Sequence, residues 1–220
     1  MASTYATERT ILRAETTGSI VEVVGGIAII VLSIIALARI GNVGALPAIS
    51  TIILGAALIA EGGTIATEFS RLMTGVLGGT ASVGEFSGGM TTEIVVGAVV
   101  LVLGVLGILG VSPATLLPSA VIVAGGLLLI AATNVQRMNA LKAATLAANE
   151  TGQALLQTAI SGAAGFQVLA AIAAIVLGII ALSSAANVAL FTVVGLLVLG
   201  AAVTMSGGTL TGSLTRLLNR

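Results

Sequence analysis

The chain has 220 residues, of which 57% are hydrophobic and only 7% charged, and its mean hydropathy is +1.22. A soluble domain carries roughly 25% charged residues, so this composition excludes a soluble globular protein and predicts an integral membrane protein. The eight basic and eight acidic residues give a net charge of zero, which argues against nucleic-acid binding. His, Cys and Asp are absent, which removes the usual ligands of metal sites and the usual groups of acid–base catalysis. We therefore expect no metal, no cofactor and no enzymatic activity.

The charged residues lie outside long apolar runs. Residues 1–18 mix Glu8, Arg9, Arg13 and Glu15 and lack the pattern of a cleavable signal peptide. No charged residue occurs in 94–136 or in 151–215, and apolar runs of about 20 residues are typical of transmembrane helices. We expect a cytoplasmic amphipathic segment at 1–18, followed by an uncleaved first span.

The sequence contains an internal repeat. Residues 27–37 (IAIIVLSIIAL) recur at 172–182 (IAAIVLGIIAL) with nine of eleven residues identical. The same register aligns 22–73 with 167–218 without a gap, and 21 of 52 positions are identical. A shift of 71 residues gives a middle copy in which Glu93 takes the place of Glu22. We therefore predict three tandem copies of one unit of about 71–74 residues.

Each copy is predicted to be a helical hairpin. The fold class is an all-α integral membrane protein with six transmembrane helices. The first helices are expected at about 19–40, 91–111 and 162–183, and the second helices at about 46–66, 117–134 and 187–205. Pro47 and Pro118 suit the first turn of a second helix. The predicted units are 19–90 (repeat 1 with an amphipathic interfacial tail), 91–161 (repeat 2 with a cytoplasmic helical extension) and 162–220 (repeat 3 with an amphipathic C-terminal tail).

One set of equivalent polar residues is Glu22, Glu93 and Gln167. Ser19 lies three residues before Glu22, and this spacing is the sequence pattern of a capping box at a helix N-terminus. Gln fills that role as well as Glu does, so we favour helix capping, and this hypothesis predicts that Glu22→Gln is nearly silent. The alternative is an acidic entrance to an ion pathway, because ionisable residues within spans mark such pathways.

Two further sets recur between the copies. Arg71, Lys142 and Arg216 are equivalent basic residues, and we expect them to anchor lipid headgroups. The glycines that recur are expected to let helices approach closely. They are Gly26, Gly97, Gly55, Gly126 and Gly200.

The stretch ILGAALIAEGG, residues 53–63, resembles the acid-bearing helix of the rotor-ring proteolipid subunit of rotary ATP synthases. The resemblance implies that Glu61 carries a proton. Several departures argue against that role: polar residues follow at once, and the equivalent positions are Ala132 and Ser206. We therefore claim no family and expect no proton carriage by Glu61.

Three functions remain open at this point. The first hypothesis is a non-enzymatic scaffold or membrane-organising element that works as a homo-oligomer, because small residues dominate the helices and reactive residue types are absent. The alternative is a channel or transporter for an ion or small solute. A second alternative is an accessory subunit that binds a lipophilic pigment, quinone or lipid. A polar cavity that reaches mid-membrane would favour transport, and a tightly packed interior would favour the scaffold.

The distribution of basic residues predicts the topology. Seven of the eight lie on the side of the termini, and Arg39 alone lies on the other side. Under the positive-inside rule, both termini are cytoplasmic, in a cell inner or intracytoplasmic membrane. A tag added to either terminus should be digested by protease applied from the cytoplasmic side. Protection from that side, with digestion from the other, would contradict the prediction.

Overall fold

Six α-helices form the protein in the computed structural model, and the described residues contain no β-strand. The backbone is described for residues 2–40, 44–76, 83–145 and 150–218, and the side chains for residues 20–40, 44–63, 92–132 and 165–206. The helices are α1 (Ala2–Leu37), α2 (Ala45–Val76), α3 (Val83–Ile108), α4 (Pro113–Thr145), α5 (Glu150–Ser183) and α6 (Val188–Leu218).

The helices identify a multi-pass membrane protein. Five of them, α1, α2, α4, α5 and α6, contain stretches long and apolar enough to cross a membrane. The apolar stretch described for α3, Thr92–Ile108, is shorter, so a sixth span stays a prediction. Helix α1 has 36 residues. At a rise of about 1.5 Å per residue, its length exceeds the ~30 Å thickness of the hydrocarbon core of a bilayer.

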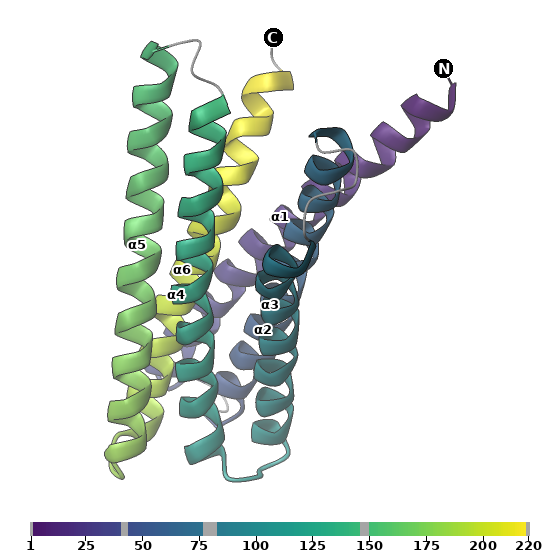
Figure 1. Cartoon of the computed structure of the whole chain (residues 1–220). Helices are drawn as coiled ribbons and strands as arrows, with labels where there is room; N and C mark the ends of the chain where they lie inside the picture. The colour runs from purple at the N-terminus through teal and green to yellow at the C-terminus, as the bar shows by residue number, and fades with distance from the viewer. Residues whose placement is uncertain (1, 41–43, 77–82, 146–149, 219–220) are drawn as a thin grey trace.

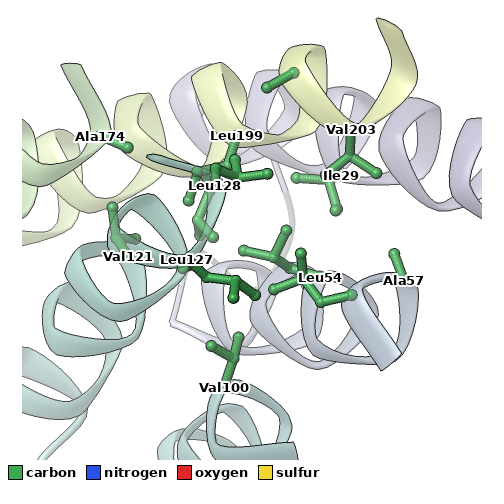
Figure 2. Packing of buried hydrophobic residues seen from close by; sticks show 14 of the residues in the cluster. Ile29, Leu54, Ala57, Val100, Val121, Leu127, Leu128, Ala174, Leu199 and Val203 are labelled. Carbon is green, nitrogen blue, oxygen red and sulfur yellow. The ribbon is translucent and has the colours of Figure 1, made fainter. Parts of the chain in front are cut away.

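The helices pack in a closed order. Each helix packs against the next one in the chain, and α1 also packs against α6. Helices α2, α4 and α6 contact one another as well, so they lie towards the inside of the bundle. Figure 1 shows that α1 begins and α6 ends at the same end of the bundle. Buried apolar side chains from all six helices meet in the core, among them Ile29, Leu54 and Leu199 (Figure 2).

Left-handed residues follow the ends of α1 and α3. Gly110 has a φ of 80°, and the Val111 N–H donates to Leu106 O at 3.0 Å. This left-handed residue with a bond back into the last turn is the usual glycine C-cap. Arg39 takes the same conformation after α1, with a φ of 56°, and the Ile40 N–H donates to Ile35 O at 3.2 Å. Both caps satisfy carbonyl groups at helix ends, which permits short connectors.

Glycines set the closest helix contacts. A Cβ atom added to Gly55 would lie 2.7 Å from Gly97 O, and one added to Gly97 would lie 3.0 Å from Gly55 O. Gly26 and Gly200 form the same kind of contact between α1 and α6, at 2.8 Å and 3.1 Å. Backbones therefore touch at both places, and a side chain at any of the four glycines would push two helices apart.

Gly126 differs from its predicted packing role within the chain. A Cβ atom added there would meet no atom within 4 Å, whereas one added to Gly125 would lie 3.0 Å from Ala171 O on α5. The face that α4 turns to α5 is thus shifted by one residue relative to the sequence alignment. Composition could not reveal this shift, because glycine occupies both positions.

The predicted unit boundaries 18/19, 90/91 and 161/162 lie inside α1, α3 and α5, because apolar spans and their polar extensions form continuous helices. The division into three units stays a prediction. Pro118 lies inside α4 rather than in its first turn, since α4 begins at Pro113. The side chains of the predicted interfacial tails lie outside the described residues.

The two glycines on α2 and α4 provide a matched test of this packing. Gly55→Ala should lower the free energy of unfolding by about 1–3 kcal/mol, because the new methyl group meets the backbone of α3. Gly126→Ala should be neutral or stabilising by up to about 1 kcal/mol, because alanine favours the helix and the space is open. Thermal unfolding in detergent measures both. Equal effects of the two substitutions would contradict the described contact between α2 and α3.

Candidate functional site

Three glutamates are buried at one end of the apolar spans. Glu22 on α1 is 1% exposed, Glu61 on α2 is 7% exposed and Glu93 on α3 is 5% exposed. Glu61 and Glu93 both act electrostatically on Glu22, and Glu61 also acts on Glu93, so the three carboxyl groups lie within range of one another. We call these three residues the acidic cluster.

Antiparallel packing brings the acidic cluster together. Glu22 is near the start of the apolar stretch of α1, Glu93 near that of α3, and Glu61 near the end of that of α2. The approach of α3 depends on Gly62, because a Cβ atom added there would lie 3.0 Å from Glu93 Cβ. Residues far apart in sequence thereby share one level of the bundle.

A hydrogen bond from another helix reaches the acidic cluster. The Ser206 hydroxyl on α6 donates to Glu61 Oε1 at 3.1 Å. Ser206 and Glu61 are aligned positions of the sequence repeat, so their contact places two equivalent positions face to face. This bond fixes the direction of the Glu61 carboxyl group towards the interior helices.

Glu22 is buried without a partner. Neither of its carboxyl oxygens has a hydrogen-bond partner within the described part of the chain, and Glu93 Oε2 is in the same situation. The one basic side chain among the described residues is Arg39, which is exposed beyond the opposite end of α1. Several kcal/mol are lost when a carboxylate is buried without a counter-charge or hydrogen bonds. Stability alone does not account for Glu22.

The capping hypothesis for these residues is wrong. Ser19 and Glu22 lie well inside α1, which begins at Ala2, and Glu93 and Gln167 lie inside α3 and α5. Inside a helix, the backbone N–H groups bond to carbonyls four residues earlier and leave no donor for a cap. Two of the four predicted positions, Glu22 and Glu93, instead belong to the acidic cluster.

The remaining predicted residues lie outside the acidic cluster or outside the described side chains. Gln167 is buried near the same end of the apolar stretch of α5. The side chains of Ser19, Arg71, Lys142 and Arg216 lie outside the described residues, so the headgroup-anchor role stays a prediction. Glu61 was set aside during sequence analysis, yet it interacts with both other glutamates. The signal that would have included it is position, because Glu61 is near the end of the apolar stretch of α2 and Glu22 near the start of that of α1, and these two ends coincide in an antiparallel hairpin.

The acidic cluster is not arranged as a metal site. Within the described ranges, no group of three or more acidic side chains is placed to hold one metal ion. The carboxyl groups can instead take up and release protons, which requires no metal ligand geometry.

A separate apolar groove lies on the outer surface between α1 and α2. It has a volume of about 470 Å³ and is lined by aliphatic side chains and glycine, among them Val21, Val24, Ala28, Ile52 and Ala56. Val24 is 60% exposed, so the groove opens towards the surface that faces lipid in a membrane. Its lining offers almost no polar group that would select one ligand.

Comparison with family models, with curated proteins and with solved structures found no match. The class of the protein therefore rests on its own structure, which is that of a multi-pass helical membrane protein with a buried acidic cluster.

Replacing Glu22 tests whether it serves function rather than stability. Glu22→Leu should raise the free energy of unfolding by about 1–4 kcal/mol, because an unpartnered buried acid gives way to an apolar side chain. Thr51→Val is the control, since the Thr51 hydroxyl donates to Pro47 O at 2.8 Å and its loss should bring no such gain. Thermal unfolding in detergent distinguishes the two. A large loss of stability in Glu22→Leu would show that Glu22 is a structural residue.

Proposed function

We propose that the protein is a non-enzymatic membrane channel or transporter that moves protons, and that the acidic cluster takes them up. The observation that carries this proposal is Glu22, whose carboxyl group is buried beside those of Glu61 and Glu93 and has no hydrogen-bond partner among the described residues. Ionisable residues inside membrane spans are costly and mark ion pathways. Three interacting carboxyl groups at one level of the bundle support such a role better than a cap does.

We further propose that the six helices are three hairpin repeats around one axis. Three kinds of contact support this arrangement. The first helix of each hairpin packs against the second helix of another hairpin, as α3 does against α2, α5 against α4 and α1 against α6. The glycine contacts between α2 and α3 and between α6 and α1 involve aligned positions. The Ser206–Glu61 hydrogen bond also joins aligned positions.

The topology predicted from the basic residues indicates which side of the membrane the acidic cluster faces. Both helix ends that lead to the chain termini lie at the end of the bundle where the cluster is found (Figure 1). If both termini are cytoplasmic, as the positive-inside rule predicts, the acidic cluster exchanges protons with the cytoplasm.

The homo-oligomeric scaffold remains an untested proposal, but its main argument is weaker. Four of the five recurring glycines make contacts inside the chain, so the need for close packing between copies does not follow from them. The interior below the acidic cluster is apolar and packed, which suits a scaffold and equally suits a transporter in a closed state. The proposal of a lipophilic ligand finds support in the groove between α1 and α2, where a lipid acyl chain would fit.

Proton flux into liposomes tests the proposed function. The purified protein is reconstituted with a pH-sensitive dye inside, and a potassium diffusion potential drives proton entry. Wild-type protein should acidify the vesicles, and Glu61→Gln should lower the initial rate at least about tenfold, because a carboxamide cannot exchange a proton. Glu22→Gln should lower it as well, in contrast to the silent effect that a cap predicts.

Thr192→Val on α6 is a matched control. The Thr192 side chain is buried, and its hydroxyl donates to Val188 O of the same helix at 2.7 Å. This substitution should leave the rate unchanged. If vesicles with wild-type protein admit protons no faster than empty vesicles, the proposal is overturned. If they admit sodium ions but not protons, the transported ion is sodium and the proton proposal is wrong.

A further inference from the structure

Two buried hydroxyl groups lie at the other end of the same two helices. Ser33 on α1 and Ser50 on α2 are each 1% exposed, and neither Oγ atom has a hydrogen-bond partner in the described ranges. Thr51, Thr192 and Thr204 are also in helices, and each donates to the carbonyl four residues earlier. Serine can form the same bond. Buried hydroxyls that leave it unmade point to a partner of another kind, of which water is the common one.

The sequence spacing puts these serines in register with the acidic cluster. Glu22 and Ser33 are eleven residues apart on α1, and Ser50 and Glu61 are eleven residues apart on α2. Eleven residues make about three helical turns and rise about 16 Å, so each pair lies on one face of its helix. Helices α1 and α2 run antiparallel, and a Cβ atom added to Gly25 would lie 3.3 Å from Ala57 Cβ. This register sets Ser33 level with Ser50, as it sets Glu22 level with Glu61.

An apolar layer separates the two polar levels. Ile29 is seven residues after Glu22 and Leu54 is seven residues before Glu61, so they share a level between the acids and the serines. Both are completely buried and belong to the core (Figure 2). A layer of this kind excludes water, and apolar constrictions close membrane pathways by the same means.

We infer that protons cross the bundle through the first hairpin, from the acidic cluster past Ile29 and Leu54 to a water-binding site at Ser33 and Ser50. This route rests on the proton-moving function proposed above. Water that briefly enters the apolar layer accepts a proton from a carboxyl group, which becomes a carboxylate, and passes it to the water held by the two serines. The carboxylate regains a proton from the other side.

The other two hairpins do not offer this route. Where the first hairpin has Ser33 and Ser50, the aligned residues are Gly104 and Val121 in the second and Gly178 and Gly195 in the third. None of these four carries a hydroxyl group. The first hairpin alone therefore has polar groups on both of its helices at both levels.

The liposome assay tests the route with variants of its two parts. Ser33→Ala combined with Ser50→Ala should lower the rate of proton entry about fivefold or more, since the water would lose its hydrogen-bond partners. Leu54→Ser should raise the rate several-fold, because a hydroxyl in the apolar layer favours entry of water. The control is Ala181→Ser on α5, where burial is equally complete and no change in rate is expected, because α5 does not pack against α1 or α2.

The outcomes separate the route from the function. If wild-type protein conducts and Glu61→Gln does not, but the serine double variant conducts normally, the route is overturned and the function stands. The same holds if Leu54→Ser and Ala181→Ser raise the rate equally. Should Leu54→Ser fail to fold, as thermal unfolding would reveal, the conservative serine variants decide alone. If wild-type protein moves no protons, both proposals fall.

Discussion

Contact between helix backbones at glycine is the interaction on which the rest of this structure depends. Helices in lipid gain little from the hydrophobic effect when they associate, so close packing must hold them together. Gly55 against Gly97 brings α3 onto α2, and Gly26 against Gly200 brings α1 onto α6. Gly62 continues the first contact and lets Glu93 approach the level of Glu61. The acidic cluster is therefore a consequence of packing that side chains larger than hydrogen would prevent.

The acidic cluster runs against the stability of the bundle that contains it. Glu22 occupies a fully buried position on a helix whose neighbouring interior residues are apolar, and its oxygens have no partner among the described residues. Proteins keep such destabilising features where function needs them. The threonines of the bundle differ in this respect. The hydroxyls of Thr51, Thr192 and Thr204 each donate to a backbone carbonyl of the same helix and need no partner from another helix.

The proposed route also explains why one hairpin differs from its copies. In the proposed arrangement of three repeats, the hairpins share one backbone plan, and substitutions at a few buried positions give each hairpin its own chemistry. In the first hairpin these positions hold Glu22, Glu61, Ser33 and Ser50, whereas glycine, alanine and valine fill most of the aligned positions elsewhere. In this proposal the second and third hairpins serve as packing partners, the second contributing Glu93 to the acidic cluster and the third donating a hydrogen bond from Ser206 to Glu61.

The sequence by itself determined the membrane class, the helical fold and the approximate places of the apolar helices, because these follow from composition and from the length of apolar runs. It also identified Glu22, Glu93 and four of the glycines at close contacts, Gly26, Gly55, Gly97 and Gly200. It misjudged the capping role and set Glu61 aside, since nothing in the local pattern shows that a polar extension continues as helix beyond the span. Only the tertiary structure decided which residues meet. The apolar sequence makes nearly every helix face alike, and the proximity of Glu22, Glu61 and Glu93 depends on how antiparallel helices are rotated and registered in space.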